Sequence, residues 1–416
     1  MIDRRTILAA VAGSIAAPAL STAQSTGKRR NLALYANVGP ALIHYDVDVE
    51  AATLTQRGTV TLPDSVQYAW PHRSHQYLYV VTSSTAPGNG AAASNSHHLL
   101  ALRIGEDGAL TPHGAPVVLP TRPINVSTDI PSEYILVAFN KPSALRVYRI
   151  NDDLTPGAEV NQAGRIDAGI YGHQVRVTPD NKLAILVTRG NEGTPTQPEE
   201  PGALKVFDYA QGKLSHEVSI APDGGLNFGP RHLDFHPTRP WIYLSIETQN
   251  QVCLLRMADG TVEPELSFRI GTLADPSKDR ARQAAGPIHV HPNGRFLYGS
   301  NRAEQTEDVG GTPVFMGGEN GIVVYELNQE TGEPTPIQHV DTRGIHPRTF
   351  HIDPSGRLLV AEHNLPVAVR GADGVGIVPA GLSVFRIGPD GRLTFVRKYD
   401  HDVGDQPMFW LGMVAP

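Results

Sequence analysis

Short apolar segments alternate with proline and glycine turns along most of this chain. The recurring unit is an apolar strand, a proline, a few turn residues and a second apolar or aromatic strand, as in "FHPTRPWIYLSI". Six such units, 48 to 62 residues apart, carry their prolines at Pro71, Pro131, Pro179, Pro237, Pro292 and Pro354. A repeat of about 50 residues with four strands in each unit predicts the blades of a β-propeller, because a β-sandwich would not repeat in this way.

The two ends of the chain share one of these units. Each complete unit continues with a third strand such as "GALKVFDYA" and a fourth such as "LTFVRKYD", whereas "NLALYANV", "ALIHYDVD" and "LTQRGTVTL" follow no first strand. The C-terminal "DQPMFWLGMVAP" has the form of that missing strand, and its pairing with "NLALYANV" would leave no open sheet edge. The sequence therefore predicts an all-β fold, a seven-bladed β-propeller of four-stranded antiparallel blades closed by the C-terminal strand.

Composition agrees with this fold and excludes several kinds of function. With 41 glycines, 34 prolines and 19% charged residues, the chain suits many short strands joined by tight turns. The net charge of −7 is not gathered into a run, so we expect no nucleic-acid partner. The single Cys253 excludes an internal disulfide, and no zinc, P-loop or G-x-S-x-G motif is present. We expect no metal and no cofactor.

The N-terminal segment differs from the rest of the chain. "DRRTILAAVAGSIAAPALSTAQ" has paired Arg4 and Arg5, a short apolar run and a small-x-small cleavage site at residues 21–23. These features predict a twin-arginine export signal over residues 1–23, with an uncleaved membrane anchor as the alternative. The remaining residues 24–416 are expected to form one domain that works in the periplasm as a monomer, with no membrane contact once the signal is removed.

Polar side chains stand at strand ends that a propeller would bring together. Because neighbouring strands are antiparallel, the starts of the innermost first strands and the ends of the second strands share one face. First strands begin with His173, Arg231, His232 and His289. Second strands end with Glu247, Asn301, Arg302, Glu362 and His363. We expect these residues to converge at one mouth of the central channel.

The connections on this face are unusually long. Those between second and third strands, rich in Gly, Pro and Ala, cover residues 83–97, 189–202, 303–320 and 364–380. Long insertions in a compact fold form functional walls or lids, or are disordered. Walls around the mouth are the interpretation that agrees with the polar residues gathered there.

The expected cluster suits proton transfer on an oxygen-rich small molecule. A histidine takes a proton from water near neutral pH, and a nearby carboxylate either orients it or acts as the base itself. Arginines donate to a carboxylate, a carbonyl or a developing oxyanion. Each residue alone also has a structural explanation, since Arg231 or Arg302 could form a surface ion pair and His232 could pack between blades. Convergence is what favours a site.

Three stretches of the chain carry a family resemblance. "GPRHLDFHPTRPWIYLSIETQNQV", "GPIHVHPNGRFLYGSNR" and "HPRTFHIDPSGRLLVAEHN" resemble the seven-bladed propeller lactonases, which include the propeller-type 6-phosphogluconolactonase and the fungal carboxymuconate lactonizing enzyme. The resemblance implies active-site roles for His173, Arg231, Glu247 and Arg302. The chain departs from many relatives at "VTRGNEG", where they have an acidic "D-L-G" stretch.

The sequence thus predicts a metal-independent lactonase that hydrolyses a small sugar-derived lactone. Arg231 and Arg302 would hold the ring carbonyl or a substrate carboxylate, and either His173 or Glu247 would activate water. The residues expected to complete the substrate-binding pocket are His232, His289, Asn301 and His363. Export favours an unphosphorylated aldonolactone over cytoplasmic 6-phosphogluconolactone. The alternatives are a cycloisomerase acting on an unsaturated polycarboxylate and a non-catalytic propeller that binds a ligand.

Overall fold

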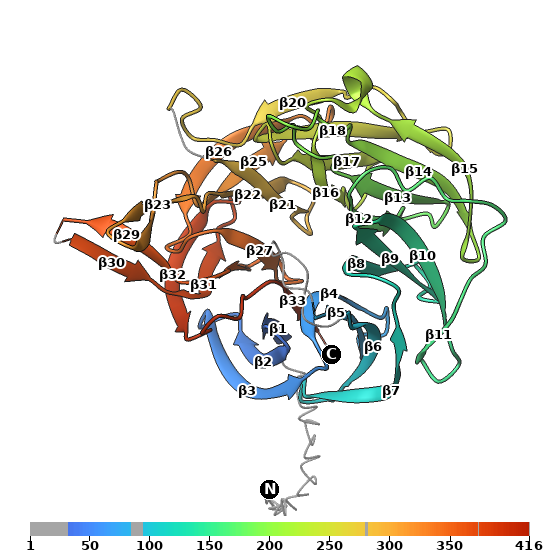
Figure 1. The fold of residues 1–416 in the computed structure, drawn as a ribbon, viewed down its shortest axis with the longest axis horizontal. Helices are drawn as coiled ribbons and strands as arrows, with labels where there is room; N and C mark the ends of the chain where they lie inside the picture. The colour runs from blue at the N-terminus through green and yellow to red at the C-terminus, as the bar shows by residue number, and fades with distance from the viewer. Residues whose placement is uncertain (1–31, 85–94, 279–281, 373, 416) are drawn as a thin grey trace, which may run out of the picture.

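Seven antiparallel sheets are arranged as blades around a central channel in the computed structural model (Figure 1). The structure describes residues 32–84, 95–278, 282–372 and 374–415, so the expected export signal lies outside the described residues. The innermost strands, which line the channel, are β4 (Ser65–Pro71), β8 (Pro123–Thr128), β12 (Gly172–Val177), β16 (Pro230–Phe235), β21 (Ala284–Val290), β27 (Pro347–Ile352) and β33 (Leu411–Val414). The seven-bladed architecture is confirmed.

The second strands of the blades are the most deeply buried elements. They are β1 (Leu32–Val38), β5 (Tyr77–Ser83), β9 (Tyr134–Asn140), β13 (Leu183–Thr188), β17 (Trp241–Ile246), β22 (Phe296–Arg302) and β28 (Leu358–His363). Every residue of β17 and β22 is buried. Because each blade packs between two neighbours, both faces of these strands are covered, and they read as continuous apolar runs instead of alternating ones.

The third and fourth strands complete the blades toward the rim. The third strands are β2 (Ala41–Asp48), β6 (His97–Ile104), β10 (Ser143–Ile150), β14 (Ala203–Ala210), β18 (Gln251–Ala258), β25 (Gly321–Leu327) and β31 (Ala380–Ile387). The fourth strands are β3 (Thr53–Thr61), β7 (Leu110–Val118), β11 (Pro156–Glu159), β15 (Lys213–Ile220), β20 (Phe268–Gly271), β26 (Pro334–Asp341) and β32 (Leu393–His401). A two-residue strand β19 (Thr261–Val262) also pairs with β18, and a 3₁₀ turn spans Pro222–Gly225.

The ring closes as the sequence predicts. Strand β33 pairs antiparallel with β1, from Ala36 opposite Leu411 to Ala33 opposite Val414, in the sheet β3-β2-β1-β33. Closure therefore joins the two ends of the described chain in one blade and covers the inner edge of β1, which would otherwise be open to another chain. None of the described residues forms a helix that is long and apolar enough to cross a membrane.

Two of the long connections form strands, which the sequence did not predict. β23 (Thr306–Val309) and β24 (Thr312–Phe315) come from one connection, and β29 (Val367–Gly371) and β30 (Gly374–Val378) come from the next. Val314 in β24 lies opposite Ala368 in β29 in a parallel pairing, so the two hairpins make one accessory sheet that projects from the ring (Figure 1). Each hairpin is too short to be stable alone, and their pairing supplies the missing contacts.

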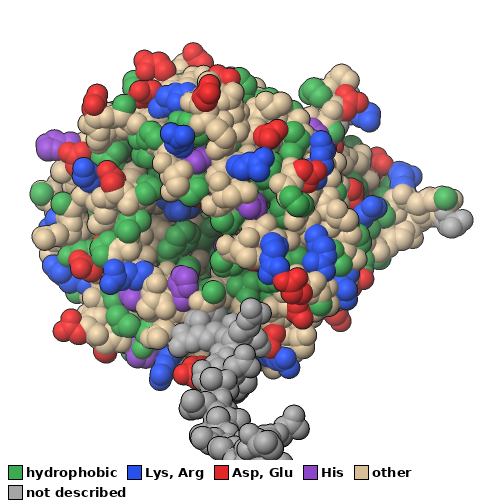
Figure 2. Space-filling view, turned by 180° about the vertical axis from the view of Figure 1, so that it is seen from behind, with side chains coloured by type: hydrophobic (Ala, Val, Ile, Leu, Met, Phe, Trp, Pro, Cys, Tyr) green, Lys and Arg blue, Asp and Glu red, His purple; other side chains and the backbone are tan. Residues whose placement is uncertain are grey.

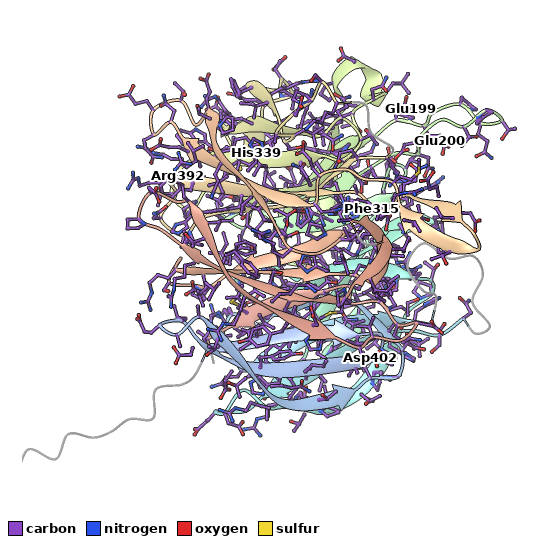
Figure 3. All side chains as sticks on the ribbon, turned by 90° about the vertical axis from the view of Figure 1, so that its left-hand side faces the viewer. Glu199, Glu200, Phe315, His339, Arg392 and Asp402 are labelled. Carbon is purple, nitrogen blue, oxygen red and sulfur yellow. The ribbon has the colours of Figure 1, made fainter. Side chains whose placement is uncertain are left out.

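The channel has two mouths, named here by the direction of the innermost strands. The upper mouth is the end where these strands begin, and the lower mouth is the end where they finish. Figure 2 shows the lower face, which is hollowed at its centre. In the side view of Figure 3, Glu199, Glu200 and Phe315 from the long connections lie on one side of the disc, and His339 and Arg392 lie toward the other.

Candidate functional site

Six of the seven innermost strands have an irregular register near their start, and in three of them the extra residue is a histidine or an arginine at the upper mouth. The pairing register shifts between Gly172 and Gln174 in β12, between Pro230 and His232 in β16, and between Pro347 and Thr349 in β27. Each shift is a β-bulge, which leaves one residue unpaired and bends the strand. The residues at these three bulges are His173, Arg231 and Arg348.

Glu247 is the centre of the cluster at this mouth. It follows β17, and three arginines surround its carboxylate. Nη1 of Arg189 donates to Oε2 at 3.2 Å, Nε of Arg231 lies 3.2 Å from Oε1, and Nη2 of Arg302 donates to Oε1. Arg302 also donates to the carbonyl of Ala285 at 2.9 Å. Glu247, Arg231 and Arg302 are only 6%, 2% and 4% exposed, so their charges meet outside bulk water, where ion pairs are strongest.

The arginines keep Glu247 ionised. Burial alone would raise the pKa of its carboxyl, but the charges of Arg302, Arg231 and Arg189 outweigh burial and hold the pKa well below its usual range. A carboxylate with so low a pKa is a weak base. Glu247 is therefore better suited to fix the three guanidinium groups than to take a proton from water.

His173, in contrast to Glu247, is uncharged. Burial, with the charge of Arg231, lowers the pKa of its imidazole well below the usual 6.5, so the ring is neutral at neutral pH. Its Nδ1 has no hydrogen-bond partner among the described residues. The His173 ring lies 5.0 Å from that of His232, whose Nδ1 is 3.4 Å from Nη1 of Arg231. A neutral, unpartnered imidazole beside a cationic cluster is a candidate proton acceptor.

Arg348, which sequence reasoning did not assign to the site, lies near Glu362, which it expected at this mouth. The Arg348 guanidinium lies 3.5 Å from the centre of the Phe409 ring. Burial raises the pKa of Glu362 to about 8, against the opposing charge of Arg348, and both its oxygens lack hydrogen-bond partners among the described residues. Glu362 is therefore mostly protonated at pH 7. The signal for Arg348 was available, because "HPRTF" repeats "GPRHL".

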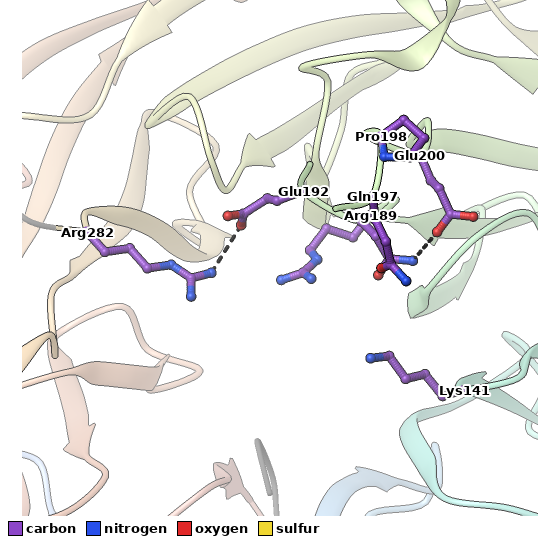
Figure 4. Close-up of a pocket in the computed structure, with 8 residues that line it drawn as sticks. Lys141, Arg189, Glu192, Gln197, Pro198, Glu200 and Arg282 are labelled. Atoms are coloured by element: carbon purple, nitrogen blue, oxygen red, sulfur yellow. Dashed lines mark hydrogen bonds and ion pairs between the residues drawn. The ribbon is translucent and has the colours of Figure 1, made fainter. Parts of the chain in front are cut away.

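An open cavity of about 570 Å³ adjoins the cluster at the upper mouth. Its lining includes Lys141, Arg189 and Arg282, and in Figure 4 the side chains of these residues point into the open centre. Arg282 donates to Glu192 at 3.1 Å, whereas Lys141 lies 5.6 Å from the Tyr171 ring. The connection over residues 189–202 forms a wall of this cavity, as the sequence predicts.

Three of the expected site residues lie elsewhere. His289 is past the middle of β21, where its Nδ1 lies 3.7 Å from Asp234 in the lower half of the channel. Asn301 donates to the carbonyl of Thr272, and the buried His363 contacts the carbonyl of Gly381. The reason is strand geometry. Successive side chains point to opposite faces, so Asn301 cannot accompany Arg302, and His363 cannot accompany Glu362.

The structure thus brings together five of the expected residues, His173, Arg231, His232, Glu247 and Arg302, and adds Arg189 and Arg348 to them. No group of three or more His, Cys, Asp or Glu within the described part of the chain is arranged to hold a metal ion. Cys253 is fully buried, and burial raises the pKa of its thiol to about 12. A buried thiol with so high a pKa is a structural core residue and not a nucleophile.

Comparisons with known proteins identify relatives over most of the chain. A family model described as "Lactonase, 7-bladed beta-propeller" matches residues 33–369. The 6-phosphogluconolactonase of Bacillus subtilis (strain 168) is 24% identical over 77% of this chain and 83% of its own length. That of Serratia proteamaculans (strain 568) is 27% identical over 88% of this chain and 93% of its own length.

Solved structures show the same fold. The periplasmic gluconolactonase of Pseudomonas aeruginosa superposes with a TM-score of 0.69 at 19% identity and covers 92% of this chain and 99% of its own. A putative 6-phosphogluconolactonase from Bacteroides uniformis gives a TM-score of 0.68 at 20% identity, over 92% of this chain and 100% of its own. At this level of identity the likeness concerns the fold alone.

Proposed function

Because this chain belongs to the lactonase family of seven-bladed β-propellers, we propose that it hydrolyses a sugar-derived lactone at the upper mouth. The observation that carries the proposal is a buried carboxylate held by three arginines beside a neutral histidine. The names of the relatives favour hydrolysis over the two alternatives, a cycloisomerase and a non-catalytic ligand-binding propeller.

In this mechanism His173 is the general base. Its imidazole takes a proton from water as the water oxygen attacks the lactone carbonyl carbon, which gives a tetrahedral oxyanion. The bond between that carbon and the ring oxygen then breaks, and protonated His173 returns the proton to the departing ring oxygen. The products are a hydroxyl and a carboxylic acid on one open chain. Of the two bases that the sequence leaves open, Glu247 is the weaker candidate, because Arg189, Arg231 and Arg302 surround its carboxylate, whereas Nδ1 of His173 has no hydrogen-bond partner among the described residues.

The arginines stabilise negative charge as it develops. Arg231 and Arg302 are fixed by Glu247 before substrate arrives, so their N–H groups need little reorganisation to face an oxyanion. The positive charge of Arg348 is not offset by the nearby Glu362, which is mostly neutral. The cluster therefore has an excess of positive charge that suits the oxyanion and the carboxylate product.

The export signal suggests which lactone is used. The twin arginines and the cleavage site near residue 23 support a periplasmic enzyme, and an unphosphorylated aldonolactone fits that compartment better than a phosphorylated one. The ring closes by the pairing of β33 with β1 of the same chain and needs no second subunit to do so, which supports a monomer.

The experiment that tests the proposal is proton release at constant pH from aldonolactones and phosphorylated lactones. The chelator-treated chain is compared with His173→Gln and Glu247→Gln variants. We expect turnover of at least one lactone, a fall in kcat in both variants and a loss of folding stability in Glu247→Gln alone. Release no faster than spontaneous hydrolysis across the panel would contradict the proposal, and turnover of an unsaturated polycarboxylate would then indicate a cycloisomerase.

A further inference from the structure

The lower mouth of the channel contains a second cavity, of about 310 Å³. It corresponds to the central hollow of the face in Figure 2. The residues that line it come from the later parts of the innermost strands and include Trp70, Arg176, Asp234, His289, Phe350 and His351. Of the residues assigned to the upper site, it contains only His232. The cavity is therefore separate from the Glu247 cluster.

An arginine and an aspartate lie side by side in this cavity. Nη1 of Arg176 donates to Oδ1 of Asp234 at 3.4 Å, and the backbone N–H of Val290 donates to Oδ2 at 2.9 Å. The Arg176 guanidinium also lies 4.7 Å from the centre of the Trp70 ring and 5.5 Å from that of Phe235. These contacts fix the pair in place, while both side chains keep part of their surface open, 19% for Arg176 and 17% for Asp234.

The charges in the cavity balance. Asp234 offsets the charge of Arg176, and burial lowers the pKa of His351 to about 4, so this ring is neutral at neutral pH. The Nδ1 atom of His351 is buried without a hydrogen-bond partner among the described residues. An anionic ligand would be repelled by Asp234 and a cationic ligand by Arg176, so the cavity suits an uncharged ligand.

The polar groups and the walls together favour a polyhydroxylated ring. A hydroxyl both donates and accepts hydrogen bonds, so neighbouring hydroxyls can donate to Asp234 and accept from Arg176 at the same time. His289 and His351, whose rings lie 5.6 Å apart, provide further donors and acceptors. Trp70, Phe350 and Trp410 supply apolar surface for the C–H faces of such a ring.

We propose that the lower mouth is a binding site for an uncharged sugar ring, distinct from the hydrolytic site. The cavity is at the small end of the range of about 300–1,000 Å³ for ligand pockets, which fits a monosaccharide unit better than a longer saccharide. The Arg176–Asp234 pair supplies the polar recognition, and the aromatic walls supply the apolar contact.

The test is binding of methyl α-D-glucopyranoside, methyl α-D-galactopyranoside and methyl α-D-mannopyranoside to the full chain, by saturation-transfer NMR and calorimetry. These probes are uncharged and contain no lactone. We expect at least one to bind, sodium gluconate to bind at least tenfold more weakly, and Arg176→Gln to weaken the sugar's Kd at least tenfold. The matched control is Arg146→Gln, which removes an arginine–carboxylate pair on an outer surface and should change Kd less than twofold.

A second variant covers the case in which Arg176→Gln fails to fold. His351→Gln keeps a polar group of similar reach and should weaken Kd at least threefold. The proposal is overturned if none of the three glycosides binds at concentrations up to about 50 mM. It is also overturned if gluconate binds as tightly as the glycosides, or if His351→Gln and Arg176→Gln both bind as the parent does. Loss of binding in Arg231→Lys with full binding in Arg176→Gln would place the sugar at the upper mouth instead.

Discussion

The two mouths of the channel are built from the same seven innermost strands, but they differ in charge and in the side chains that line them. At the upper mouth, Glu247 faces three arginines and the nearby His173 has a strongly shifted pKa. At the lower mouth, one Arg176–Asp234 pair lies among aromatic side chains. The upper mouth has an excess of positive charge, whereas the lower mouth is balanced. At these two mouths, the position of a side chain along its innermost strand therefore decides its chemical surroundings more than the blade to which it belongs.

The bulges explain much of this difference. They occur near the start of the strands, where they re-aim His173, Arg231 and Arg348 toward the upper mouth. Beyond each bulge the pairing becomes regular, so His232 and Asp234 in β16 follow the ordinary alternation of a strand. In these three strands the bulge, together with the residue that occupies it, thus separates a cationic cluster from a neutral cavity, and changes to single residues can test the separation.

Removal of the central carboxylate should have the largest effect. Glu247→Gln leaves Arg189, Arg231 and Arg302 without their shared counter-charge, so we expect kcat/KM to fall by about 10³-fold. The free energy of unfolding should fall by about 3–5 kcal/mol, because buried charges lose their partner. Lactone titration at constant pH and urea denaturation measure the two quantities.

The control for this change is Glu326→Gln, which removes an exposed carboxylate 4.0 Å from Arg295 on the outside of a blade. It should alter stability by less than about 0.5 kcal/mol and leave turnover unchanged. If Glu247→Gln were as stable and as active as this control, Glu247 would not organise the upper mouth, and the contrast between the mouths would lose its basis.

Loss of the proposed base should have the next largest effect. His173→Gln should lower kcat by about 10²–10⁴-fold and change KM little, since the arginines that hold the substrate remain. Because burial and Arg231 lower the pKa of His173, the parent should keep its kcat/KM as the pH falls from 7 to 6 and lose it only at lower pH. A pH profile of kcat/KM for both proteins checks this.

The matched control is His216→Gln, at a side chain that is 83% exposed on β15. It should leave the profile as it is. An unchanged kcat in His173→Gln, or an acid limb in the parent near pH 6.5, would argue that another group takes the proton from water.

The fold could be predicted from the sequence because the segments that indicate a blade occur again in each blade. The proline spacing, the continuous apolar runs of strands such as β17, and the matching end segments all follow from blades that pack against blades. The accessory sheet was not readable. Its four strands are short, their pairing joins two connections about 60 residues apart, and Val375 and Ile377 in β30 are exposed, so no apolar periodicity marked them.

The candidate site could be predicted only in part, because its residues depend on local strand geometry that does not repeat in every blade. Strand ends predicted correctly that His173, Arg231, Glu247 and Arg302 would meet. The same reasoning was wrong for Asn301, because neighbouring residues of a strand point to opposite faces of the sheet and Asn301 precedes Arg302. Bulges are local departures from this rule, and a single sequence indicates them only where a motif repeats, as "HPRTF" repeats "GPRHL".

Glu362→Gln should act on stability, with a smaller effect that depends on pH. The pKa of Glu362 is raised from its usual 4.5 to about 8 by burial, so the folded state holds a proton that the unfolded state releases. The parent therefore loses stability relative to the variant as the pH rises from 4.5 to 8. We expect equal stability near pH 4.5 and a variant more stable by on the order of 2 kcal/mol at pH 6. Urea denaturation at both pH values measures the difference, and a difference that does not change with pH would show that Glu362 is ionised in the folded protein.

The smallest expected effect concerns the independence of the two mouths. A methyl glycoside that saturates the lower cavity should change kcat/KM for the lactone by less than about fivefold, the lower end of ordinary coupling between sites. The physical reason is that, of the upper-site residues, only His232 also lines the lower cavity, and the hydrogen-bonded inner strands between the mouths allow little movement. Lactone kinetics at zero and saturating glycoside measure the coupling.

A larger change would identify His232, whose ring lies 5.0 Å from that of His173, as the connection between the mouths. A His232→Asn variant should then abolish the coupling while glycoside binding persists.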